Sequence, residues 1–215
     1  MKILNLYAGI GGNRKLWGND HEITAIECDP EIIEIYKKHF PEDKVILCDA
    51  HEYLLEHYSE YDFIWSSPPC PTHSRFMNLK NNCEEVVKRY PDMKLWQEII
   101  FLKHFFKGKW VVENVISYYE PLDFQEIKPQ ICNNHYFWAN FTIPPTMATD
   151  NRDIRNRDLD YKKERNGFNL DMCAIPNNKK RKLLNNCVKP EVGLEIFNAA
   201  FNVKQHGLST FTESR

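Results

Sequence analysis

Short runs rich in β-branched and aromatic residues alternate with helix-length amphipathic segments along the first half of this chain. Such alternation is typical of parallel strands joined by crossover helices. Strands are expected near Lys2 to Tyr7, Ile23 to Glu27, Val45 to Cys48, Phe63 to Trp65 and Trp110 to Glu113. Helices are expected to begin near Asn13, Pro30, Ala50 and Glu84, the last of them reaching about Phe106. We therefore expect an α/β fold with a mostly parallel sheet flanked by helices.

The pattern of apolar and polar residues changes after Val115. Residues His135 to Ile143 have the pattern of an aromatic strand, and Pro190 to Phe201 have the apolar spacing of a helix. The polar stretch between them predicts a long loop or a small subdomain. We divide the chain into a core over residues 1–143, a loop-rich insertion over 144–182 and a C-terminal segment over 183–215 that returns to the core.

Composition narrows the class of protein. At 215 residues the chain suits one ordinary domain, and its 28 basic and 30 acidic residues exclude an overall basic field. Any contact with nucleic acid must then come from a local basic patch. The seven cysteines are odd in number and form no C-x-x-C pair, and no run of apolar residues is long enough to span a membrane. We expect a soluble, cytoplasmic protein with reduced thiols.

Glycines and acids follow the first three predicted strands. The first strand ends in Tyr7-Ala8-Gly9-Ile10-Gly11-Gly12, where glycine allows close approach of a cofactor to the backbone; a tight turn without a ligand has the same pattern. Glu27-Cys28 ends the second strand and Asp49-Ala50 follows the third. Ligands of open α/β sheets bind outside the carboxyl ends of the strands, so these positions predict a pocket for a nucleoside-containing cofactor.

A cysteine framed by prolines follows the fourth strand. The segment Ser66-Ser67-Pro68-Pro69-Cys70-Pro71 holds the thiol on a rigid loop, because proline fixes φ and restricts the residue before it. The polar residues 72–75 predict an exposed, partly electropositive setting that favours thiolate. His73 or Arg75 would supply that charge, or would instead cap the loop. The other six cysteines are expected to be small buried apolar residues.

The fifth strand ends in Glu113-Asn114-Val115. A carboxyl group beside a buried strand is disfavoured as an anion and can keep or share a proton near neutral pH. A carboxylate that caps the next turn is the structural alternative.

Taken together, these motifs resemble the DNA cytosine-5 methyltransferase family, especially the small members carried by bacteriophages. The resemblance implies a Rossmann-like class I S-adenosylmethionine-dependent methyltransferase fold with a reduced target-recognition insertion. It implies methyl transfer from S-adenosyl-L-methionine to C5 of a flipped-out cytosine in duplex DNA, within a prokaryotic or phage-infected cell and as part of restriction-modification. Cys70 would form the covalent adduct, Glu113 would act at N3 of the base, and Asn114 would orient the Cys70 loop.

The resemblance also implies a cofactor site and no metal. Residues Leu184 to Pro190 look like the family's last motif, which returns to the cofactor pocket. The implied cofactor-binding residues are Tyr7, Ala8, Gly9, Gly11, Gly12, Glu27, Cys28, Asp49, Ala50, Pro69, Asn186 and Val188.

Two departures from the family pattern stand out. Pro71 replaces the usual Gln, and the Gln-x-Arg-x-Arg segment has no clear copy. Arg155 and Arg157 are our candidates for those catalytic arginines; the alternatives are that residues 130–134 are a version that lost them, or that the arginines belong to a solvated loop. The insertion is also short, so target recognition should be brief, degenerate or assisted by a partner or oligomer. Phosphate contacts are expected from Arg165 and residues 179–182, unless these form only a solvated surface.

Three other functions compete with this hypothesis. An RNA (tRNA-type) cytosine-5 methyltransferase would share the ring chemistry. A catalytically weak methyltransferase-fold protein that binds nucleic acid would explain the missing arginine motif, but not the intact Cys70 and Glu113. A nicotinamide-dependent oxidoreductase would need Gly-x-Gly-x-x-Gly, which the first turn lacks.

Overall fold

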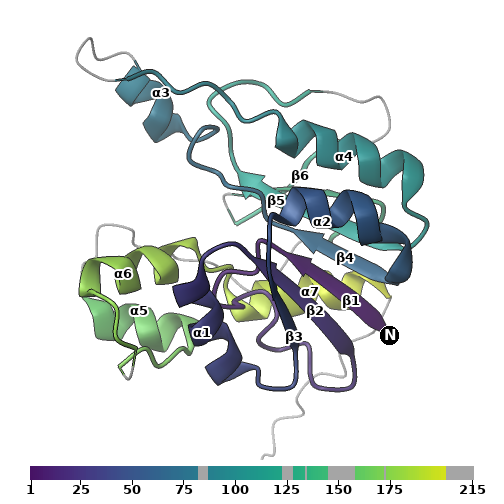
Figure 1. The fold of residues 1–215 in the computed structure, drawn as a ribbon. Coiled ribbons are helices and arrows are strands. Elements are labelled where there is room, and N and C mark those ends of the chain that lie inside the picture. The colour runs from purple at the N-terminus through teal and green to yellow at the C-terminus, as the bar shows by residue number, and fades with distance from the viewer. Residues whose placement is uncertain (82–86, 123–127, 134, 145–157, 172, 202–215) are drawn as a thin grey trace, which may run out of the picture.

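The strands of the computed structural model form one sheet, as the alternation predicted (Figure 1). The structure describes residues 1–81, 87–122, 128–133, 135–144, 158–171 and 173–201. Within this part of the chain the sheet has seven strands in the order β3-β2-β1-β4-β5-β7-β6. The first five strands are parallel, and β7 runs antiparallel to β5 and β6. The strands are β1 (Lys2–Leu6), β2 (Glu22–Glu27), β3 (Lys44–Leu47), β4 (Phe63–Ser66), β5 (Lys109–Val115), β6 (Gln130–Cys132) and β7 (His135–Ala139).

The helices begin where the sequence supplies helix-starting residues. Asp29, Asp49 and Asp158 each cap a helix by accepting a backbone N–H, and proline opens two helices. The helical elements are α1 (Pro30–His39), α2 (Ala50–His57), the 3-10 turn η1 (Tyr58–Glu60), α3 (Arg75–Asn81), α4 (Lys94–Phe105), α5 (Leu159–Asn166), α6 (Asn177–Asn186) and α7 (Pro190–Ala200).

The core lies on both faces of the sheet. Alternate strand residues point to opposite faces, so Leu4 packs with residues of α2 and α4, whereas Ile3 packs with residues of α7. Trp110 is 1% exposed on the first face, and Trp65 is fully buried on the second. Covering both faces is what a parallel sheet requires.

Two expected helices differ from the structure. Residues 12–17 form turns and no helix follows the glycines, because Asn13 bonds to Asn5 through its side chain and its backbone lies against Gly193. Of the expected helix from Glu84 to Phe106, the described residues contain α4, which begins at Lys94; residues 84–86 lie outside the described part. Residues 87–93 are not helical, and Pro91 disfavours helical backbone in the residue before it.

The polar stretch before residue 183 contains helices α5 and α6, which pack on each other. This pair contacts the N-terminal part of the fold through Lys179, whose ammonium lies 2.9 Å from Asp29, and through Lys15, which donates to the carbonyl of Gly167. Helix α6 runs across the expected boundary between residues 182 and 183, so this boundary does not coincide with the end of an element. The division into three segments is a prediction.

Gly193 provides a test of how α7 packs. Alanine normally stabilises a helix interior by about 1 kcal/mol relative to glycine. At Gly193, however, an added Cβ would lie 2.4 Å from the carbonyl oxygen and 2.7 Å from the Cα of Asn13. We expect Gly193→Ala to lower the free energy of unfolding by about 2 kcal/mol in urea titrations because of this overpacking. Glu191→Ala, at an exposed site of the same helix, should change it by no more than about 0.5 kcal/mol; a more stable Gly193→Ala protein would contradict the packing.

Candidate active site

The order of strands in the sheet reverses between β1 and β4. These strands are parallel neighbours, with Leu6 paired to Ser66 at their carboxyl ends. In open α/β sheets this switch point is where ligands bind. The glycine loop that follows β1 and the loop that carries Cys70 after β4 therefore start side by side (Figure 1).

The glycine loop has an open side and a packed side. Tyr7, Gly9 and Gly11 all have positive φ, at 55°, 56° and 85°. A Cβ added at Gly9 would meet nothing within 4 Å, whereas one at Gly12 would lie 2.1 Å from the sulfur of Cys187. Residues 187 and 188 thus support the loop from behind, and the backbone at Gly9 faces space that a ligand can occupy.

Glu27 ties the glycine loop to the end of β2. Its carboxylate accepts the backbone N–H groups of Gly9 at 3.0 Å, Cys28 at 2.9 Å and Asp29 at 3.0 Å. Cys28 Sγ also lies 3.6 Å from Oε1, which accepts the N–H groups of Cys28 and Asp29, whereas Oε2 accepts that of Gly9. A carboxylate oxygen has two acceptor positions, so room remains on Oε2 for a hydroxyl donor such as those of a ribose. The glycine backbone and this carboxylate together fit the nucleoside part of S-adenosylmethionine.

Asp49 stands at the end of β3 and caps α2. Its Oδ1 accepts the N–H of Glu52 at 3.0 Å, and its Oδ2 lies 3.2 Å from Lys94 Nζ. Partial burial works to raise the pKa of Asp49, but the hydrogen bonds from Glu52 and Lys94 outweigh it and the pKa lies below its ordinary value. Asp49 is therefore an exposed anion at the same sheet edge, followed by the buried Ala50.

A buried carboxylate that the sequence analysis did not identify lies beneath these loops. Glu98 of α4 is fully buried and accepts hydrogen bonds from Tyr7 Oη at 2.6 Å and Ser66 Oγ at 2.6 Å, and it lies 3.0 Å from His51 Nδ1. Burial and the neighbouring Glu98 raise the pKa of Tyr7, so the phenol stays protonated. The Glu98 hydrogen bond raises the pKa of His51. A signal was present, because Glu98 stands on the apolar face of its helix, between Leu95 and Leu102.

The loop that carries Cys70 is fastened from the β5 side. Asn114 Nδ2 donates to the carbonyl of Pro68 at 3.0 Å, and Tyr118 N–H donates to the carbonyl of His73 at 3.2 Å. His73 N–H donates to the carbonyl of Cys70 at 3.0 Å, which closes a turn. Cys70 is half-buried, so its side chain is held in place while still reaching the surface.

The side chain of His73 anchors this loop. Its ring is buried and its Nδ1 lies 2.5 Å from Tyr119 Oη. Burial lowers the pKa of His73, so the ring is neutral near pH 7. The sequence left open whether His73 supplies positive charge to Cys70 or caps the loop, and the structure supports the cap. Arg75 is exposed at the start of α3.

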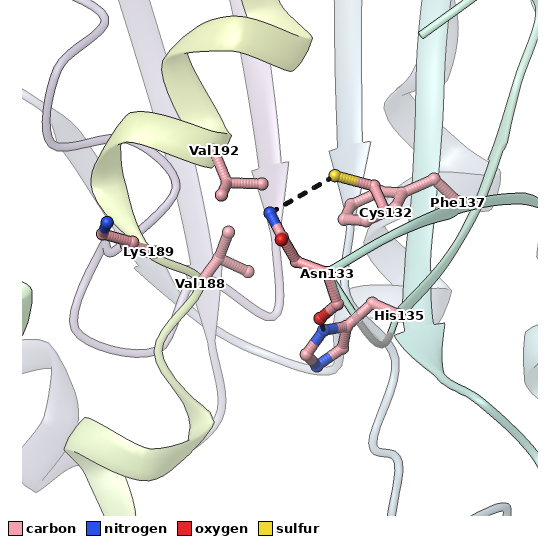
Figure 2. Close-up of a pocket in the computed structure, with 7 residues that line it drawn as sticks. All are labelled: Cys132, Asn133, His135, Phe137, Val188, Lys189 and Val192. Atoms are coloured by element: carbon pink, nitrogen blue, oxygen red, sulfur yellow. Dashed lines mark hydrogen bonds between the residues drawn. The ribbon is translucent and has the colours of Figure 1, made fainter. Parts of the chain in front are cut away.

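Glu113 lies at the carboxyl end of β5, next to the Cys70 loop. The residue before it, Val112, is paired with Ser66 of β4, and Glu113 is 9% exposed. Its Oε1 lies 3.6 Å from Nε2 of His135 on β7. Next to His135 is a small pocket (Figure 2). Its lining residues are Cys132, Asn133, His135, Phe137, Val188, Lys189 and Val192.

Two of the five basic residues expected to contact phosphate have intramolecular partners, and a third is buried. Lys179 pairs with Asp29 and Glu31, Lys180 is 7% exposed, and Arg165 donates to Asn166 at 2.9 Å. The α5 and α6 region therefore uses these cations to hold itself together and to dock on α1. The two arginine candidates, Arg155 and Arg157, lie outside the described residues.

The network of Glu98 can be tested by one substitution. The Glu98 carboxylate accepts three hydrogen bonds. Glu98→Gln removes its charge and replaces one of its two acceptor oxygens by an NH2 group, which cannot accept. We therefore expect a loss of about 3 kcal/mol in the free energy of unfolding. Tyr53→Phe, which removes the 3.0 Å hydroxyl contact with Tyr61, should cost no more than about 1 kcal/mol.

The same variant has a pH signature. His51 has a raised pKa, so its stabilisation is complete below its ordinary value of 6.5 and is lost as pH rises through the folded-state value. The loss caused by Glu98→Gln, measured by urea unfolding, should thus be larger at pH 6 than at pH 9. A difference that does not change with pH would contradict the His51 contact.

Comparison with known structures supports the fold. The Entamoeba histolytica methyltransferase EhMeth superposes with a TM-score of 0.59 at 12% identity, covering 94% of this chain and 98% of that one. A mutant DNMT2 of Spodoptera frugiperda superposes with a TM-score of 0.56 at 14% identity, covering 93% and 99%. No curated protein matches the chain. The Rossmann-like methyltransferase fold expected from the sequence is confirmed.

Family membership rests on the sequence itself. The family model for C-5 cytosine-specific DNA methylases matches residues 1–138, which include every motif up to β7. None of the helices in the described ranges is long and apolar enough to cross a bilayer. The chain belongs to the C-5 cytosine-specific DNA methylase family.

Proposed function

We propose that this protein transfers a methyl group from S-adenosylmethionine to C5 of a cytosine flipped out of duplex DNA, through a covalent adduct with Cys70. Family membership supports cytosine-5 methylation, and the description of the family supports DNA as the substrate. An RNA substrate is the alternative outcome of the test below.

One contact carries the proposal more than any other. Asn114 Nδ2 donates to the carbonyl of Pro68, and this bond joins the residue after Glu113 to the loop that carries Cys70. The Cys70 loop follows β4 and Glu113 lies near the end of β5. These adjacent parallel strands are in register, with Ser66 paired to Val112. A nucleophile and an acid held at neighbouring strand ends can contact two sides of a single ring.

The chemistry follows from these two groups. A cytosine in a duplex hides C5 and C6 in the stack, so the base must leave the helix. The thiolate of Cys70 attacks C6 and forms a C–S bond, while the electron pair of the ring double bond moves toward C5 and N3. Glu113 donates a proton to N3, which neutralises the charge pushed into the ring.

The cofactor pocket lies at the other side of the switch point. Gly9 and the remaining acceptor position of Glu27 would hold the ribose end of S-adenosylmethionine. Asp49 would hold the adenine end. When bound there, the cofactor supplies an electrophilic methyl group for C5. Release of the base then requires three changes: water takes the C5 proton, whose bonding pair restores the C5=C6 bond, the C–S bond breaks and leaves Cys70 as thiolate, and the proton on N3 returns to Glu113.

Recognition of the target requires basic residues that approach the DNA. The formal charge of -2 and the pairing of Lys179 with Asp29 and Glu31 argue against a broad basic face over α6 in the described ranges. We therefore propose that Arg155 and Arg157 approach the base, and that a partner or a second copy supplements the short insertion.

The proposal predicts the effect of removing each reacting group. Cys70→Ala and Glu113→Gln should each reduce methyl transfer by at least about a thousandfold, because both groups serve one intermediate. Binding of S-adenosylmethionine should stay within about twofold. The assay measures transfer of labelled methyl groups to duplex DNA, single-stranded DNA and tRNA, with Cys173→Ala as a cysteine control in the α5 and α6 region.

The outcomes separate the competing functions. Retained turnover in Cys70→Ala would remove the covalent scheme. Methylation of tRNA with none of DNA would transfer the proposal to RNA. A protein that binds nucleic acid and methylates none of these substrates would be the catalytically weak binding protein.

The cofactor pocket predicts a different effect for Glu27. Glu27→Ala removes the hydroxyl acceptor and releases three backbone N–H groups of the loop, so we expect S-adenosylmethionine to bind about 10- to 100-fold more weakly by calorimetry. Glu22→Ala, at the exposed opposite end of the same strand, is the matched control. Equal dissociation constants for Glu27→Ala and the unmodified protein would show that the pocket is misassigned.

A further inference from the structure

The carboxyl group of Glu113 has a basic neighbour that the proposed function does not use. Nε2 of His135 lies 3.6 Å from Glu113 Oε1, and the two side chains are 17% and 11% exposed. They reach each other because β5 and β7 are antiparallel neighbours, with Val115 paired to His135. This distance is within ion-pair range, and such contacts often shorten when a substrate binds.

The tautomer of His135 follows from its other nitrogen. Nδ1 lies 3.1 Å from the carbonyl oxygen of Asn133, and a carbonyl oxygen can only accept a hydrogen bond. Nδ1 must then carry a proton. In the neutral ring Nε2 therefore presents its lone pair toward Glu113, which is the arrangement in which a carboxylic acid and an imidazole share one proton.

We propose that His135 is a positioning residue that shares with Glu113 the proton delivered to N3 of the cytosine. This inference rests on the proposed function and names a further residue of that site. In the resting pair the proton is bound either to Glu113 with a neutral ring or to Nε2 with a carboxylate. When Cys70 adds to C6, the proton moves from Glu113 to N3, and it returns when Cys70 is eliminated. The Nδ1 proton stays on the ring throughout.

Two other titratable residues line the pocket beside His135. Lys189, from the segment before α7, lines the same pocket as His135 (Figure 2). Its Nζ lies 3.9 Å from Glu191. Cys132 lines the pocket from β6. Lys189 lies beyond Val188 from the ring in Figure 2, so the charged group that bears on His135 is Glu113.

Sharing the proton extends the pH range of the acid. A carboxylic acid that shares its proton with an imidazole keeps that proton to higher pH than a lone carboxyl group does. His135→Gln leaves Glu113 as the lone acid. The ratio of wild-type to variant kcat/KM should rise from less than about tenfold at pH 5 to about a hundredfold at pH 8.

The first experiment measures this ratio. His57→Gln is the matched control, because His57 Nδ1 lies 2.7 Å from Glu60 in an exposed pair away from the site; its profile should follow the wild type. Taking the ratio removes the contribution of the Cys70 thiol, which both proteins share. A loss in His135→Gln that is the same at every pH between 5 and 8 would show a merely structural role and overturn the proposal.

The second experiment needs no turnover. The ring signals of His135 are followed by NMR across pH in the wild-type protein and in Glu113→Gln. We expect the midpoint to fall by about one pH unit when the carboxylate is removed. Equal midpoints would overturn the pairing even in an active enzyme, and they remain measurable if His135→Gln does not fold. Different midpoints in a protein that methylates no nucleic acid would leave the pair in place and reject its role at N3 together with the proposed function.

Discussion

The buried carboxylate of Glu98 is the interaction on which the site depends most. It joins helix α4 to the ends of β1 and β4 and to the start of α2 through Tyr7, Ser66 and His51. A charge without partners inside a protein costs several kcal/mol, so the carboxylate is stable only while its donors stay in place. The glycine loop and the loop that carries Cys70 are therefore held at fixed positions relative to each other by one side chain that neither loop contains.

A second set of contacts fastens Cys70 and Glu113 to the sheet. Asn114 holds Pro68, and the ring of His73 lies against Tyr119, so the Cys70 loop is tied to the segment that continues β5. Glu113 belongs to that same strand. Groups attached to rigid strand ends keep their geometry without a bound ligand, which is the preorganisation that a two-group mechanism requires.

The end of the chain completes the pocket. Cys187 and the backbone of Val188 lie against Gly12, and Gly193 of α7 lies against Asn13. These contacts leave no space for a side chain at Gly12 or Gly193. Lys179 meanwhile attaches α6 to the start of α1, so a cation that looked suited to phosphate has an intramolecular use. The short insertion thus supports α1, and the residues that follow it support the glycine loop after β1.

The sequence by itself determined the alternation of strands and helices through β5, the glycine turn, and the placing of Cys70 and Glu113 at the ends of neighbouring strands. These features depend on local periodicity, turn chemistry and the rule that parallel strands end at one edge. Only the tertiary structure decided that no helix follows Gly12, that Glu98 lies beneath the site, and that His135 faces Glu113. The reason is physical: each of these depends on contacts between residues far apart in the chain, which hydrophobic spacing does not encode.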